Sequence, residues 1–224
     1  MFHEQNTPAE VIKKYPQASD LFKQYHINFC CKGDRTISNQ CEDLNISPAT
    51  IVNELNDRYD VWKKEGRAAK EWDNIPIPEL VEIIRSKYHI YLKKELVMLN
   101  EYVTRVNHVH GQEQPHLNTL YDLYEQVKDN IVTHIQLEER EFFNNLQTGE
   151  DAHQEKIEMV NKLEENHEKT YEILQAIRKV TEDFEAPAHA CGTYRVTYSR
   201  LNELEAKVHE YIHLENNILF PRIA

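Results

Sequence analysis

The sequence predicts an all-α protein in which a small N-terminal helical domain precedes an up-down four-helix bundle. Apolar residues recur at alternating spacings of three and four, which is the pattern of a helix with one buried face. The five glycines (Gly33, Gly66, Gly111, Gly149 and Gly192) lie outside these periodic stretches, and the eight prolines avoid their interiors. Because glycine and proline interrupt helices, this placement favours helices separated by loops.

The small helical domain is expected at residues 1–65. Thr7-Pro8-Ala9-Glu10 reads as a capping box and predicts a short helix that stops near Tyr15-Pro16. A second short helix is expected at about 17–26. Ser47-Pro48 opens a longer helix that ends at Gly66. Residues 66–78 contain an Ile-Pro-Ile-Pro stretch, which predicts a semi-rigid extended linker.

Four long helices are predicted in residues 79–224, at about 79–109, 115–147, 151–183 and 193–220. Helices near 30 residues that are joined by short loops pack as an antiparallel bundle. The inward apolar positions are Leu92, Leu96, Leu99, Val103 and Val106 in the first helix; Leu117, Leu120, Tyr124, Val127 and Ile131 in the second; Ile157, Val160, Tyr171 and Leu174 in the third; and Leu201, Leu204, Val208 and Ile218 in the fourth.

Polar residues occupy inward positions of all four helices. They are His89 in the first, His134 and Glu138 in the second, His167 in the third, and Tyr211 and Glu215 in the fourth. Counted from the helix ends, they all lie in the same half of an antiparallel bundle. Any one of them could be a hydrogen-bonded core residue, but a buried carboxylate or imidazole is costly unless it is paired or bound to a metal. Their convergence favours a metal centre.

The donor types suggest which metal is bound. The spacing of His134 and Glu138 places an imidazole and a carboxylate one turn apart on one helix face. Such donors suit iron, manganese or zinc. His89, His167 and Glu215 supply more donors than one tetrahedral zinc needs, so two metal ions are predicted. Iron is favoured by analogy with other carboxylate-bridged sites in helical bundles.

Charge and composition exclude several classes of partner. The net charge is −12, and most of it falls on residues 77–224, so neither nucleic acid nor a membrane is an expected partner. The N-terminus lacks the features of a signal peptide, and no apolar stretch approaches the ~20 residues that span a bilayer. We therefore expect a cytoplasmic protein whose cysteines (Cys30, Cys31, Cys41 and Cys191) are reduced.

The inward polar residues of the four helices resemble the metal ligands of the hemerythrin-like di-iron bundle. Two further segments, Ile27-Asn28-Phe29-Cys30-Cys31-Lys32-Gly33 and His213-Leu214-Glu215-Asn216-Asn217-Ile218-Leu219-Phe220-Pro221, make the chain similar to the iron–sulfur cluster repair (RIC) family over essentially its whole length. The resemblance implies two iron ions bridged by carboxylates and by oxo or hydroxo groups. It assigns the ligands to His89, to His134 with Glu138, to His167, and to Glu215 with the residue four positions before it.

The residue four positions before Glu215 is Tyr211, where the family pattern has histidine. Three outcomes are open. Tyr211 could bind ferric iron as a phenolate, one iron could keep an open or water-filled position, or a helix distortion could bring His209 or His213 inward. We favour Tyr211 within the site.

The adjacent cysteines also have two interpretations. Cys30 and Cys31 could form an exposed thiol pair whose pKa is lowered by the Lys32 cation, or they could pack as small hydrophobes. A disulfide between adjacent cysteines is strained. The resemblance favours thiol chemistry, so Cys30 and Cys31 are candidate catalytic residues that pass electrons or hold iron in transit.

The resemblance therefore implies a di-iron protein that repairs iron–sulfur clusters damaged by nitric oxide or oxidative stress. Its expected partners are damaged iron–sulfur proteins and small molecules such as nitric oxide or oxygen, and a homodimer is compatible with the tethered small domain. One rival is a hemerythrin-like protein that binds or senses oxygen or nitric oxide, which predicts a site richer in histidine. A second rival is a metal-free helical adaptor.

Overall fold

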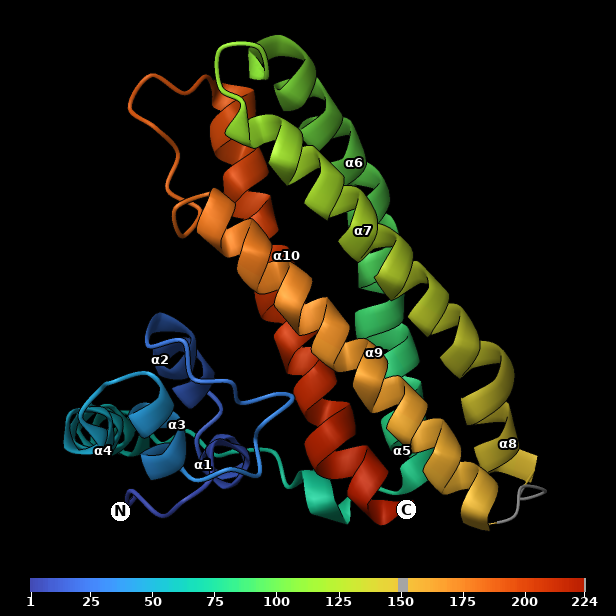
Figure 1. Cartoon of the computed structure of the whole chain (residues 1–224). Helices are drawn as coiled ribbons and strands as arrows, with labels where there is room; N and C mark the ends of the chain where they lie inside the picture. Colours follow the sequence, from blue (N-terminus) through green and yellow to red (C-terminus); the bar gives the residue numbers. More distant parts are fainter. Residues whose placement is uncertain (149–152, 224) are drawn as a thin grey trace. The chain divides into compact units, whose positions relative to one another are not determined.

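The computed structural model describes residues 1–148 and 153–223, and every regular element in these ranges is helical. The predicted all-α class is therefore confirmed. The contacts within the chain define two compact units, whose elements are labelled in Figure 1. The first unit joins Met1–Pro76 to the segment Ile212–Arg222, and the second consists mainly of Ile77–Tyr211. None of the described helices is long and apolar enough to cross a membrane.

The N-terminal part of the first unit contains α1 (Pro8–Lys14), α2 (Ala18–Gln24), α3 (Ile37–Asp43) and α4 (Pro48–Lys64). The predicted capping box of α1 is confirmed, because the Thr7 hydroxyl accepts from the Glu10 N–H and the Glu10 carboxylate accepts from the Thr7 N–H. Gly66 follows α4 with a φ of 72°, the left-handed conformation in which helices commonly end.

Two features of this unit differ from the prediction. The sequence analysis missed α3, a seven-residue helix that begins after the cap residue Thr36. Within the expected linker, Trp72–Asn74 form a 3-10 turn, η1, and the next helix, α5 (Ile77–Ile83), begins at Ile77. The linker is therefore shorter and more folded than the proline pattern predicted.

The segment Ile212–Arg222 packs against the double-cysteine loop within the first unit. The side-chain amides of Asn216 and Asn217 donate to the Cys30 carbonyl oxygen over 3.3 and 3.0 Å. Gly33 fits closely beside this segment, since a Cβ atom added there would lie 2.5 Å from the Phe29 carbonyl oxygen and 2.6 Å from the Asn217 side-chain oxygen. The glycine is needed for this close approach.

The second unit is built from long helices that run beside one another (Figure 1). Helix α5 leads through a π-helical turn, η2 (Ile84–His89), into α6 (Ile90–His110). Helix α7 (His116–Leu137) leads through η3 (Glu138–Phe142) into α8 (Phe143–Thr148), and α9 (His153–Val180) follows. Helix α10 (Gly192–Leu214) belongs to this unit as far as Tyr211, and the same chain segment continues in the first unit through η4 (Glu215–Leu219) to the 3-10 turn η5 (Phe220–Arg222). Residues 151–152, predicted to begin the third helix, lie outside the described residues.

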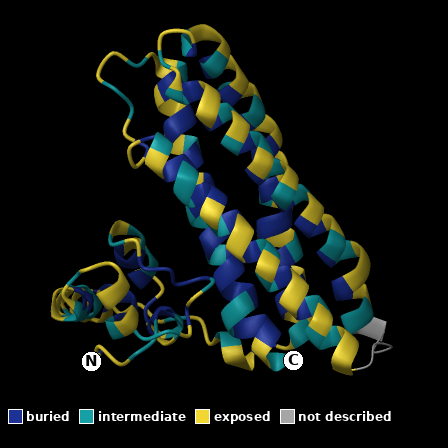
Figure 2. Ribbon diagram, viewed as in Figure 1, coloured by how far each residue is buried: buried dark blue, intermediate teal, exposed yellow. Residues whose placement is uncertain are grey.

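The predicted apolar seams are buried, as the dark blue segments of the long helices in Figure 2 show. Every inward apolar position predicted in the first, second and fourth long helices is buried. On α9, Val160 and Leu174 are buried, whereas Ile157 and Tyr171 are half-buried. The alternating spacings of three and four residues between apolar positions therefore identified the inward faces of the helices correctly.

Three π-helical turns interrupt helices that were predicted to be continuous α-helices. The first ends at His89, the second begins at Glu138, and the third begins at Glu215. A π turn changes the direction in which the following side chains point, and such turns are frequent at functional sites. Each of the three adjoins a predicted ligand.

Candidate metal centre

All six residues predicted to form the metal centre are buried. The relative exposures of His89, Glu138 and Glu215 are 0%, that of His167 is 1%, and those of His134 and Tyr211 are 3%. They lie on α7, α9, α10 and three π turns, at the inward positions that the heptad pattern assigned.

Glu138 lies between two imidazole rings of the second unit. Its Oε2 atom is 3.2 Å from His89 Nε2 and 3.3 Å from His134 Nε2. The Tyr211 hydroxyl donates a short hydrogen bond to the same carboxylate oxygen. Burial alone would raise the pKa of the Glu138 carboxyl, but the two imidazoles outweigh burial and hold this pKa well below its usual range.

His134 and His167 face one another across α7 and α9. Their Nε2 atoms are 3.0 Å apart, and the ring centroids are 4.5 Å apart. Two imidazoles that point their ring nitrogens at one place are well arranged to share a cation, since neutral imidazole nitrogens are common metal ligands.

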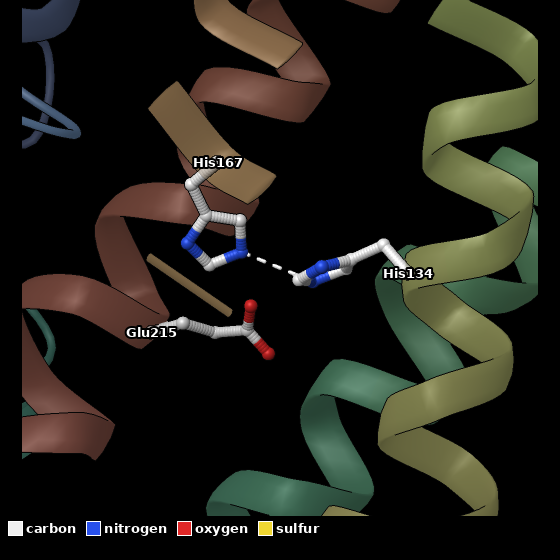
Figure 3. A group of neighbouring side chains, drawn as sticks. All are labelled: His134, His167 and Glu215. Carbon is white, nitrogen blue, oxygen red and sulfur yellow. Dashed lines mark hydrogen bonds between the residues drawn. The ribbon is translucent and has the colours of Figure 1, made fainter. Parts of the chain in front are cut away.

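Glu215 follows Tyr211 by about one helical turn, because α10 continues into η4 without a break. Figure 3 shows Glu215, His134 and His167 pointing toward one another. Potential ligand atoms of these three residues lie within 4.8 Å of one another, and those of His89, Glu138 and Glu215 form a second such group. Glu215 belongs to both groups, so one carboxylate is placed to bridge two cations.

This donor set fits a pair of metal ions. It offers imidazole nitrogens and carboxylate oxygens, with Glu215 common to both groups. Such mixed nitrogen and oxygen ligands, projecting inward from separate helices, are typical of di-iron and di-manganese sites in bundles. Buried carboxylates without a cation would face a large desolvation cost, which two cations would offset.

Tyr211 lies among the three histidine rings. Its ring centroid is 5.6 Å from that of His89 and 5.9 Å from those of His134 and His167, each at a steep angle. Since its hydroxyl donates to Glu138, direct binding of Tyr211 to iron would require this proton to leave.

The two histidines that flank Tyr211 lie elsewhere. The His209 ring packs on Tyr171, with centroids 5.3 Å apart, and His213 Nδ1 lies 3.4 Å from the Phe29 carbonyl oxygen. Neither belongs to the two groups of potential ligands found among the described residues. A helix distortion is present, but it begins at Glu215, after both histidines. The geometry therefore favours Tyr211 over His209 and His213 as the sixth residue of the centre.

The expectation of an exposed, acidified thiol pair is wrong for Cys30. Cys30 is buried, and burial raises the pKa of its thiol well above the usual value. Cys31 is half-buried, and the two sulfur atoms are 3.7 Å apart. The Asn28 side-chain oxygen accepts from the Cys31 N–H over 2.9 Å and fixes the turn. Burial, which the motif does not reveal, is the largest cause of the raised pKa, and the neighbouring Cys31 thiol adds to it.

Sequence reasoning missed two contributors to these sites. Asn217 fixes the double-cysteine loop, and Glu139 contacts the outer nitrogen of His89 over 3.0 Å. Asn217 lies in the C-terminal segment that carried the resemblance, so its presence was visible although its role was not. Glu139 lies next to Glu138 in the sequence, and no periodic pattern distinguishes it from a surface charge.

The fold and these residues define a helical cation-binding protein. Residues 83–223 match the family model described as the hemerythrin HHE cation binding domain, and residues 4–59 match a domain of unknown function (DUF542). The chain belongs to the family of iron–sulfur cluster repair proteins that combine these two domains.

Named relatives align with the chain over nearly all of their length. The chain is 32% identical to the iron-sulfur cluster repair protein ScdA of Staphylococcus epidermidis, and the match covers 100% of both chains. It is 31% identical to the ScdA protein of Staphylococcus haemolyticus, again over 100% of both chains. It is 28% identical to the iron-sulfur cluster repair protein YtfE of Yersinia pseudotuberculosis, over 92% of this chain and 91% of the relative.

Proposed function

We propose that this chain is a cytoplasmic di-iron protein that restores iron–sulfur clusters damaged by nitric oxide or oxidative stress. The observation that carries the proposal is the pair of buried ligand groups that share Glu215. A site of this form suits two cations held close together, and the relatives that align over the whole chain are named iron-sulfur cluster repair proteins.

One iron would be held by His134, His167 and Glu215, and the other by His89, Glu138 and Glu215. Iron bound there would supply one-electron redox chemistry and a store of iron for a damaged cluster. The protein's own contribution is to exclude water from the donors, to orient His89 and His134 about Glu138, and to keep a proton on the Tyr211 hydroxyl beside that carboxylate.

Cys30 and Cys31 would supply the thiol chemistry of the small domain. Cys31 is the more accessible of the two, so we assign the first contact with a reaction partner to Cys31. Cys30, whose sulfur lies 3.7 Å from that of Cys31, would hold iron in transit together with Cys31. The expected partners are damaged iron–sulfur proteins together with nitric oxide or oxygen, and the proposed assembly is a monomer or homodimer.

Recovery of a damaged enzyme tests this function. A purified iron–sulfur enzyme inactivated by nitric oxide is incubated anaerobically with the iron-loaded chain, and its activity is followed. Recovery is expected with the parent and with Glu141→Gln, an exposed residue used as a control, but not with apoprotein or Glu138→Ala. Loss of recovery in a Cys30→Ser, Cys31→Ser double variant would support the thiol role.

Two results would contradict the proposal. Equal recovery with and without the chain would exclude a repair activity. Reversible binding of oxygen to the ferrous protein without any recovery of the enzyme would favour the oxygen-binding alternative instead.

A further inference from the structure

His89 is held between two consecutive glutamates of η3. On its inner side, Nε2 lies 3.2 Å from Glu138 Oε2. On its outer side, Nδ1 lies 3.0 Å from Glu139 Oε1. The imidazole also stacks on the Phe143 ring, with a centroid distance of 5.8 Å and an interplanar angle of 19°. The ring is therefore restrained at both nitrogens and on one face.

The outer carboxylate is bound from its other side by a lysine of α6. The Lys93 ammonium lies 2.8 and 2.6 Å from the two carboxylate oxygens of Glu139. The Glu139 side chain is 31% exposed and that of Lys93 is 47% exposed, whereas His89 is fully buried. The row from Lys93 through Glu139 to His89 thus connects the surface with the buried centre.

The contact between Glu139 and His89 determines the tautomer of the ring. A carboxylate accepts hydrogen bonds, so Nδ1 carries the proton in this contact, and the Nε2 lone pair would be available to a cation bound beside Glu138. A carboxylate behind a metal-bound imidazole fixes its orientation and makes it a stronger donor. Lys93 acts in the opposite sense, because its positive charge draws electron density from the same carboxylate.

We propose that Glu139 is a positioning residue of the metal centre and that Lys93 limits its effect on His89. This inference rests on the proposed function, since it concerns the iron bound by His89. A plain surface ion pair predicts a different outcome, because exposed pairs contribute little to stability and losing either partner has the same consequence.

The experiment compares iron release from four anaerobically loaded variants: Glu139→Ala, Glu139→Gln, Lys93→Gln and the control Glu141→Gln. Glu141 is an exposed carboxylate of the same π turn. Release to an excess of a ferrous chelator is followed by absorbance, and the iron dissociation constant is measured in parallel. The melting temperature of each apoprotein reports any purely structural damage.

Glu139→Ala is expected to raise the iron dissociation constant by about 10–100-fold, the usual effect of losing an outer carboxylate. Glu139→Gln keeps an oxygen that accepts a hydrogen bond from the His89 Nδ1–H, so the iron dissociation constant should rise less than in Glu139→Ala. Lys93→Gln should release iron no faster than the parent, and Glu141→Gln should match the parent. Opposite effects at Glu139 and Lys93 would separate positioning from a structural ion pair.

Two outcomes overturn the inference and are distinguishable from each other. If the parent binds iron and Glu139→Ala binds it equally well, Glu139 has no positioning role while the metal centre stands. If the parent binds no iron, both the proposed centre and the role of Glu139 fail.

Discussion

Replacing Glu138 by glutamine keeps the side-chain volume but removes one negative charge from the middle of the proposed centre. In the parent, Glu138 Oε2 lies 3.2 Å from His89 Nε2 and 3.3 Å from His134 Nε2, and it accepts from Tyr211; the amide has no negative charge at this position. The group that contains His89 and Glu215 therefore loses its central anionic donor. We expect the variant to fold and to bind ferrous ion weakly.

The size of the effect follows from binding linkage. A ligand present at 100 times its dissociation constant stabilises the folded state by about 2.7 kcal/mol. In a chain of this size, that energy corresponds to a rise in melting temperature of about 5–11 °C. If Glu138→Gln weakens binding 100-fold, the same free iron contributes only about 0.4 kcal/mol, or about 1–2 °C.

Differential scanning calorimetry under anaerobic conditions measures this difference directly. The parent, Glu138→Gln and the exposed control Glu141→Gln are each scanned without metal and with ferrous ion at one fixed free concentration. The parent and the control should show the full rise, and Glu138→Gln should show little of it. An equal rise in all three proteins would refute the assignment of Glu138 as a ligand.

Four further predictions concern Tyr211, Gly33, Glu205 and the adjacent cysteines. If Tyr211 binds ferric iron, Tyr211→Phe should abolish a visible phenolate-to-iron absorption band; a parent without such a band rules out direct ligation. Gly33→Ala should destabilise the protein by about 1–3 kcal/mol in urea unfolding, because the new Cβ would lie 2.5 Å from a backbone oxygen. Gly192→Ala, with no atom within 4 Å of the new Cβ, is the matched control, and equal stability of the two variants would contradict this packing argument. Glu205→Ala leaves the Arg178 guanidinium without its buried partner and should cost about 3–5 kcal/mol, against about 0–1 kcal/mol for the half-buried Lys207–Glu210 pair near the surface. Similar losses from both pairs would show that burial is not decisive. Iodoacetamide at pH 8 should label Cys31 before Cys30 in fragmentation mass spectra, since burial raises the pKa of the Cys30 thiol; the reverse order would contradict this.

The long helices could be predicted because their apolar pattern is repeated many times. The seams on α6, α7 and α10 each contain several apolar residues, so an error at one position does not change the inward face. Helix α3 was not predicted, because its seven residues bury only Ile37, Gln40 and Cys41. Three buried positions are too few to show a helical period. The π turns were also not predicted, because apolar spacings of three and four do not reveal a local hydrogen bond between residues i and i+5.

The residues of the candidate site could be predicted wherever a polar side chain occupies an inward position among apolar neighbours. His134 and Glu138 are conspicuous because inward neighbours such as Ile131 are apolar, and the structure brings them together as expected. Glu139 lies outside the seam, so only its contact with His89 gives it a role. The surroundings of Cys30 include residues far away in the sequence, such as Asn217, which donates to the Cys30 carbonyl oxygen, and no local motif contains that information.

Anomalous scattering at the iron absorption edge, from crystals of the iron-loaded protein, tests the central claim most directly. The account predicts two peaks inside the bundle, one beside His134, His167 and Glu215 and the other beside His89, Glu138 and Glu215. Iron found only at surface residues, or no ordered iron in crystals of a protein soaked with ferrous salt, would contradict it.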